Sequence, residues 1–161
     1  MTESLKHSAL ILKLNERLFV NALAGVTDSQ ATHRISEHNN PIVWIATHTV
    51  WARYNMAAML GKPGENPYNG LFENFKAFDA SMQLPAIADI ITEWKKATVL
   101  LNEGLESVSE GHLGGDAPFK NPTGDFTIGG TIAFLAQHES YDIGQLGFLK
   151  KFHTNEPMSY N

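Results

Sequence analysis

The sequence predicts an all-α fold, a four-helix bundle with long connections. Four segments of roughly twenty residues carry apolar residues at spacings of three and four, which is the pattern of an amphipathic helix. No segment shows the alternating pattern of a half-buried strand, and no internal repeat indicates a solenoid. The chain has 161 residues, of which 43% are hydrophobic and 18% charged. We therefore expect residues 1–161 to form a single domain with one core.

The first predicted helix covers residues 4–23, and Ser4 or Thr2 can serve as its N-cap. Its apolar residues at helical spacing are Leu10, Ile11, Leu14, Leu18 and Phe19. A polar segment over residues 24–40 follows, and we expect it to be an irregular connection that ends at Pro41.

The second predicted helix covers residues 41–60 and begins at Pro41, because proline is favoured at the first position of a helix. It ends where Gly61 and Pro63 forbid its continuation. Residues 68–82 carry aromatic side chains among polar ones, so we expect a packed loop that covers the bundle rather than a linker. These apolar residues are Leu71, Phe72, Phe75 and Phe78.

The third predicted helix begins near Pro85 and continues to about Leu105. Its apolar face consists of Ile87, Ile90, Ile91, Trp94, Leu101 and Leu105. The fourth predicted helix covers residues 127–152, with Asp125 or Thr127 as its cap. The long connections between the helices leave room for a crossover, and spacing alone does not order the helices in space.

Composition excludes several classes of function. The chain has no cysteine, so disulfides, thiolate-bound metals and thiol nucleophiles are absent. It has 12 basic and 17 acidic residues, so it lacks the excess of positive charge that is typical of nucleic-acid-binding proteins. No stretch reaches the ~18 apolar residues of a membrane span, and the first residues do not resemble a secretion signal. We expect a cytoplasmic protein that binds neither nucleic acid nor membrane.

Polar residues interrupt the expected inner faces of two helices. A projection at ~100° per residue places His48 in the middle of the most apolar face of residues 41–60. In residues 127–152 the same construction centres on His138, with Asp142 and Gln145 following at steps of four and three. A buried ionisable group is costly unless it is paired or coordinated, so this row requires an explanation.

Two explanations remain open at this stage. In the first, His48, His138 and Asp142 bind a metal ion and leave coordination positions open for water or substrate. In the second, Asp142 holds a histidine in one tautomer within a metal-free hydrogen-bonded network. Glu139 is a weak candidate for proton transfer, although a solvated or cross-helix role suits it better. Four aromatic residues, Trp44, Trp51, Phe134 and Tyr141, could line a ligand pocket or belong to the core.

Taken together, several motifs resemble those of the DinB-like superfamily of metal-binding four-helix bundles. They are Asn40-Pro-Ile-Val-Trp-Ile-Ala-Thr-His48, Gly61, Thr127-Ile-Gly-Gly, Phe134-Leu-Ala-Gln-His138-Glu139 and Asp142-Ile-Gly-Gln145-Leu146. The resemblance implies one divalent ion, such as nickel, zinc, iron or manganese, held by His48, His138 and residue 142. Members of that family usually have a third histidine where this chain has Asp142. Two histidines and a carboxylate also suit a borderline divalent ion.

The resemblance implies a metal-dependent enzyme of the thiol S-transferase or hydrolase type, with a low-molecular-weight thiol as one implied cofactor. Asn55 and Gln145 are then expected to donate hydrogen bonds to the metal ligands. The alternative is a non-catalytic, metal-free bundle that binds a small ligand or acts as a scaffold. Dimers are frequent among such proteins, so we expect a homodimer.

Overall fold

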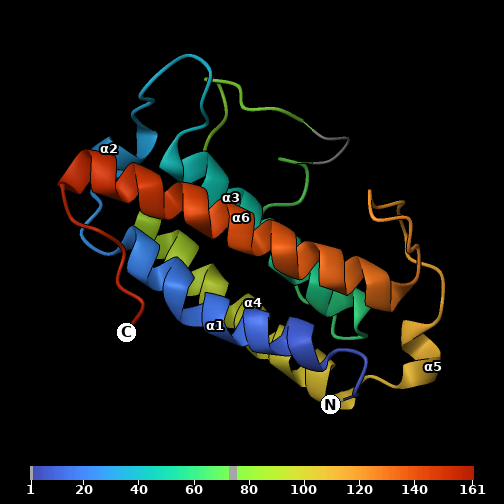
Figure 1. The fold of residues 1–161 in the computed structure, drawn as a ribbon. Helices are drawn as coiled ribbons and strands as arrows, with labels where there is room; N and C mark the ends of the chain where they lie inside the picture. Colours follow the sequence, from blue (N-terminus) through green and yellow to red (C-terminus); the bar gives the residue numbers. More distant parts are fainter. Residues whose placement is uncertain (1, 73–75) are drawn as a thin grey trace.

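A computed structural model describes residues 2–72 and 76–161 of the chain (Figure 1). These residues contain six helices joined by loops. They are α1 (Lys6–Leu23), α2 (Asp28–Thr32), α3 (Ile42–Met59), α4 (Ile87–Ser107), α5 (Glu110–Leu113) and α6 (Ile128–Thr154). The four long helices confirm the predicted all-α fold. The short helix α2 lies in residues 24–40, which the sequence predicted to be irregular, and α5 is a short helix after the third predicted helix that the sequence did not predict.

The four long helices form one bundle in which α6 packs against both α1 and α3, and α3 packs against α4 (Figure 1). Helices α1 and α6 run parallel, because Asn15 bonds to Glu139 and, further along, Asn21 bonds to Lys150. Helices α3 and α4 also run side by side in the same direction (Figure 1). The connection between them, residues 60–86, therefore returns along the bundle as the crossover that long connections allow.

The caps of α6 are as predicted, whereas the cap of α1 is not. The Thr127 side chain accepts a hydrogen bond from the Gly130 amide, and Asp125 accepts bonds from the Thr127 amide and hydroxyl. Helix α1 has Leu5 at its N-cap position and no side-chain cap. The predicted cap Ser4 instead donates its hydroxyl to Glu110 of α5 at 2.6 Å. A carboxylate from another part of the chain has taken the place of the local backbone partner.

The predicted inner faces of α3 and α6 are wrong. The buried face of each helix is rotated from the predicted one by about one residue, or ~100° about the helix axis. On α6 the buried face is centred on Glu139, which is 3% exposed, and His138 lies at its edge. On α3 the buried row passes through Thr49 and Arg53, while His48 is only partly buried. Both helices carry apolar residues almost all the way round, so the hydropathy pattern does not fix their rotation.

Helix α1 also differs from the prediction in the face that it buries. Three of the residues expected on its apolar stripe, Leu10, Ile11 and Leu14, are exposed. The buried face instead contains Leu12, Leu18 and Phe19 together with the polar residue Asn15. Phe19 stacks on Trp94 of α4 with ring centroids 4.0 Å apart, and this pair lies in the core of the bundle.

The loop that follows α3 covers one side of the bundle, as its aromatic content predicts. Tyr68 and Phe72 are buried against the core. Phe75, which was expected to contribute to the same cover, lies outside the described residues. The segment thus positions Phe72 over the part of α3 that carries His48.

Candidate metal centre

The structure brings together the three side chains that the sequence singled out. His48 of α3 and Asp142 of α6 approach to 3.1 Å between Nδ1 and Oδ2. His138 lies one turn before Asp142 on α6, with Nε2 3.8 Å from the same carboxylate oxygen. The three side chains each offer one ligand atom, and these atoms lie within 4.8 Å of one another. Because α3 and α6 are antiparallel neighbours, their packing creates this cluster.

The Asp142 carboxylate is held by two further donors. The Thr49 hydroxyl and the Gln145 amide nitrogen each lie 3.4 Å from one of its oxygens. Thr49 was missed by sequence reasoning, although it directly follows His48 and could have been found from that position. Among the described residues no hydrogen bond joins Asn55 to the three clustered side chains, and its predicted role stays a prediction. The carboxylate is therefore fixed in place before any ligand arrives.

Aromatic rings surround the two histidines. The ring of Trp44 lies parallel to that of His48 at 5.3 Å, and Phe72 meets His48 edge-on at the same distance. Phe134 stacks near His138 at 5.9 Å. These apolar neighbours restrict the rotation of the imidazoles and lower the local dielectric constant, which strengthens interactions with a charge placed between them. The side chain of Tyr141, by contrast, is 60% exposed and points out of the bundle.

Glu139 lies in the core, beside Arg53. Its Oε2 is 3.7 Å from Nε of Arg53, and its Oε1 accepts a hydrogen bond from Asn15 of α1 at 3.0 Å. Burial raises the pKa of Glu139, while the charge of Arg53 and the bond from Asn15 oppose that shift. The guanidinium lies over the face of Trp94 at 3.9 Å. These contacts favour the cross-helix role of Glu139, and its role in proton transfer stays a prediction.

The donor set fits a divalent metal ion. Two imidazole nitrogens and one carboxylate oxygen suit zinc, nickel, iron or manganese. Two ligands at roughly 2.0–2.1 Å from a tetrahedral ion are about 3.3 Å apart. The observed separations of 3.1 and 3.8 Å from Asp142 lie on either side of that value. All three ligand atoms lie within 4.8 Å of one another, so His48, His138 and Asp142 would bind one ion after their side chains move closer together.

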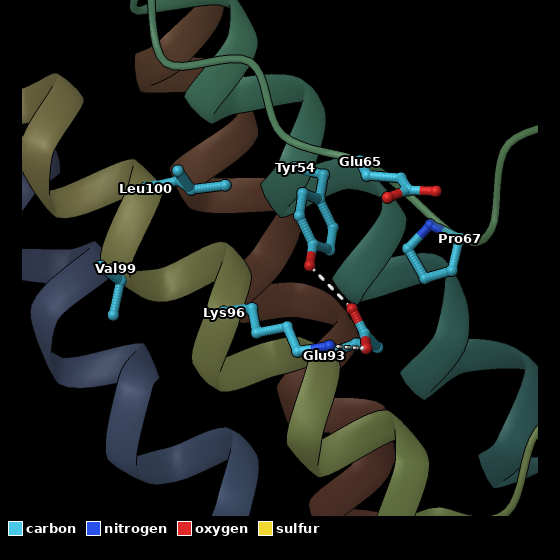
Figure 2. Close-up of a pocket in the computed structure, with 7 residues that line it drawn as sticks. All are labelled: Tyr54, Glu65, Pro67, Glu93, Lys96, Val99 and Leu100. Carbon is cyan, nitrogen blue, oxygen red and sulfur yellow. Dashed lines mark hydrogen bonds and ion pairs between the residues drawn. The ribbon is translucent and has the colours of Figure 1, made fainter.

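A separate pocket of about 530 Å³ lies on the other side of α3, between α3 and α4. Figure 2 shows that Tyr54 and Lys96 both point toward Glu93. The Tyr54 hydroxyl donates to Glu93 at 2.8 Å and the Lys96 ammonium donates at 2.6 Å. Burial would raise the pKa of Glu93, but these two bonds hold it below its usual value. Tyr54, Glu93 and Lys96 satisfy one another in this pocket, which contains none of the predicted site residues.

Comparison with protein families supports this assignment of the fold. A model of the DinB superfamily matches residues 11–146, so the chain belongs to that superfamily. A solved structure, that of a conserved protein from Enterococcus faecalis, superposes with a TM-score of 0.75. The match covers 97% of this chain and 100% of that chain at 14% identity, which shows a shared fold. No curated protein matched the sequence. None of the helices in the described residues is both long enough and apolar enough for a membrane span.

Proposed function

We propose that this protein is a metal-dependent enzyme of the thiol S-transferase or hydrolase type, with one divalent ion on His48, His138 and Asp142. The convergence of these three donors within 4.8 Å carries the proposal. Three protein ligands leave coordination positions for water or substrate, as a catalytic ion requires. A bound ion would supply Lewis acidity, lowering the pKa of a thiol or water that serves as the nucleophile.

The surrounding residues have separate roles in this proposal. Thr49 and Gln145 orient the Asp142 carboxylate, and Trp44 with Phe72 restricts the His48 ring. The side chain of His138 is 35% exposed, whereas that of Asp142 is 7% exposed. The cluster is therefore accessible on the His138 side, where a substrate could approach.

A second candidate function rests on the hydrogen bonds of Asp142. His48, Thr49 and Gln145 already contact both carboxylate oxygens, so the network is satisfied without an ion. This observation favours the metal-free alternative, a non-catalytic bundle that binds a small ligand or acts as a scaffold. The two functions differ in a property that is simple to measure, the stoichiometry of bound metal.

The test is the metal content of untagged protein prepared without a nickel column, determined by elemental mass spectrometry. We expect about one equivalent of a divalent ion in the wild-type protein and none in His138→Ala, which lacks one of three ligands. His38→Ala is the matched control, because His38 is exposed and is not one of the clustered side chains. A wild-type protein that also refuses added zinc, nickel, manganese and iron(II) would establish the metal-free alternative.

Metal affinity should also depend on pH. Imidazole must be neutral to bind an ion, so protons compete with the metal. We expect the affinity for zinc to fall between about pH 8 and about pH 5, measured by competition with a chelating dye. Affinity that stays constant over this interval would contradict imidazole ligation.

The homodimer and the cytoplasmic location also stay proposals. For the dimer, the exposed residues Leu10, Ile11 and Leu14 of α1 offer an apolar surface that a second copy could cover. Sedimentation velocity on the wild-type protein and on Ile11→Glu tests this surface. A monomeric wild-type protein would overturn it.

A further inference from the structure

A pocket of about 480 Å³ opens beside the candidate metal centre. It lies between the loop that precedes α3 and the C-terminal half of α6. Ile45 and Leu149, which are 2% and 4% exposed, belong to the core and line its floor. Tyr141 and Phe148 line it from α6 and are 60% and 64% exposed, respectively. A volume of this size suits a small organic ligand.

The glycine at position 144 leaves this pocket open. Gly144 lies on α6 between Tyr141 and Phe148 and lines the pocket. A Cβ added at this position would meet no atom within 4 Å. A glycine inside a helix lowers its stability relative to alanine, so the position has a cost that the local backbone does not explain. The open space above Gly144 is where a ligand would gain contact with both aromatic side chains.

Besides the phenol of Tyr141, the polar side chains that line the pocket are neutral carboxamides. They belong to Asn39, Asn40 and Gln145, and none of the lining residues in the described chain is charged. The Asn39 side chain accepts a bond from the Ser36 amide at 2.7 Å, which holds the loop in shape. Carboxamides donate and accept hydrogen bonds without favouring either sign of charge. The lining therefore suits an uncharged ligand with a flat apolar body and a hydrogen-bonding end.

Gln145 links this pocket to the candidate metal centre. It lines the pocket, and its amide nitrogen lies 3.4 Å from Oδ1 of Asp142. Ile45 likewise lies one helical turn before His48 on α3. A molecule seated between the two aromatic side chains would thus have its polar end at Gln145, next to the three clustered side chains.

We propose that this pocket binds the apolar body of the substrate, and that the substrate is an uncharged, flat molecule with an amide-like or carbonyl end. The assignment as a substrate site rests on the proposed function, whereas the binding of such a ligand does not. We therefore test binding on metal-stripped protein, so that a failure of the metal centre leaves the result for the pocket intact.

The experiment compares three flat probes of nearly the same shape, benzamide, benzoate and benzamidine, by two-dimensional NMR of ¹⁵N-labelled protein. We expect benzamide to shift the amide signals of Gly144, Gln145 and Asn40, with the two charged probes at least about tenfold weaker. Gly144→Leu fills the open space and should abolish the benzamide shifts. The control Ala133→Leu makes a similar change at an exposed position of α6 outside the pocket and should leave them unchanged.

The melting temperature of Gly144→Leu shows whether the variant is folded. It should equal or exceed that of the wild-type protein, because an added Cβ meets no atom within 4 Å, the rest of the side chain extends into the open pocket, and glycine disfavours the helix. A folded Gly144→Leu that binds benzamide as well as the wild type does would overturn the proposal. Equal binding of the charged probes, or no benzamide shift at these residues, would overturn it as well.

Discussion

At the scale of single residues, the most consequential pair is Arg53 and Glu139. The side chain of Arg53 is 0% exposed and that of Glu139 is 2% exposed. The guanidinium donates to the Leu12 carbonyl at 2.9 Å, and its Nε and Nη1 have no hydrogen-bond partner among the described residues. Desolvation makes such a pair a weak source of stability, but each charge needs the other.

The first prediction follows from this dependence. Glu139→Gln leaves a buried guanidinium without its counter-charge and should lower the free energy of unfolding by about 3–5 kcal/mol. The double variant Arg53→Met with Glu139→Leu removes both charges and should be more stable than Glu139→Gln. Urea unfolding followed by circular dichroism measures all three proteins. A double variant less stable than Glu139→Gln would show that the charges themselves stabilise the core.

These residues also mark where sequence reasoning reached its limit. The sequence placed His48, His138 and Asp142 together because an ionisable row on an inner face is unusual. It gave no account of Arg53, because a lone arginine in an apolar helix can extend to solvent. Arg53 lies four residues after Thr49, and this helical spacing was the available sign that the two side chains share the buried face of α3. Only the rotation of the packed helices decides which side chains are enclosed.

At the scale of the elements, the close approach of α3 and α4 depends on Gly104. A Cβ at this position would lie 2.8 Å from Cβ of Leu60, at the C-terminal end of α3. The Leu60 side chain is buried, and its Cβ cannot rotate away. The steric clash could therefore be relieved only if α3 and α4 moved apart. Gly144 on α6 lies in open space and serves as its natural comparison.

The second prediction compares these two glycines. Gly104→Ala should destabilise the protein by about 1–3 kcal/mol, because overpacking outweighs the gain in helix propensity. Gly144→Ala should stabilise it by about 1 kcal/mol, because only the propensity changes. Thermal denaturation of both variants measures the difference. Stabilisation by Gly104→Ala would mean that the two helices separate readily.

The third prediction concerns the start of α6. Hydrogen bonds from the Thr127 hydroxyl and amide lower the pKa of Asp125. A lowered pKa in the folded state means that the ionised carboxylate stabilises the fold above the unfolded pKa, and that this contribution is lost as pH falls through the folded pKa. The stability difference between the wild-type protein and Asp125→Asn should therefore shrink between about pH 6 and about pH 3. A difference that grows in acid would contradict this.

The ends and buried faces of some helices could be predicted from the sequence, and those of others could not. Helix α4 has one apolar face, and its buried residues Ile87, Ile90 and Trp94 were all predicted. Helix α3 is apolar nearly all round, so its ends were predicted well and its rotation was not. The cap of α1 was missed because Ser4 bonds to Glu110, a partner more than one hundred residues away. Long-range contacts of this kind leave no local pattern.

At the scale of the whole molecule, a metal at the candidate centre would join α3 to α6. An ion that binds only the folded protein stabilises it by mass action, by about 2.7 kcal/mol at a hundredfold excess over the dissociation constant. For a chain of this length that corresponds to a rise in melting temperature of about 5–10 °C.

The fourth prediction is that a chelator reverses this stabilisation in the wild-type protein. Calorimetry with added zinc, and then with a chelator in excess, measures the effect. His138→Ala should melt at the same temperature under both conditions, whereas His38→Ala should behave like the wild type. An unchanged melting temperature in the wild-type protein would favour the metal-free bundle.

The parallel pairing of the first and last long helices has a consequence for synthesis on the ribosome. Helix α1 emerges early, yet its buried face is completed by α6, the last helix to be made (Figure 1). Until residues 128–154 leave the exit tunnel, Arg53 lacks the charge of Glu139, and the faces of α1 and α3 that pack against α6 remain uncovered. The nascent chain must therefore wait, nearly complete, before it can close its core, and during that interval it is a natural client for chaperones.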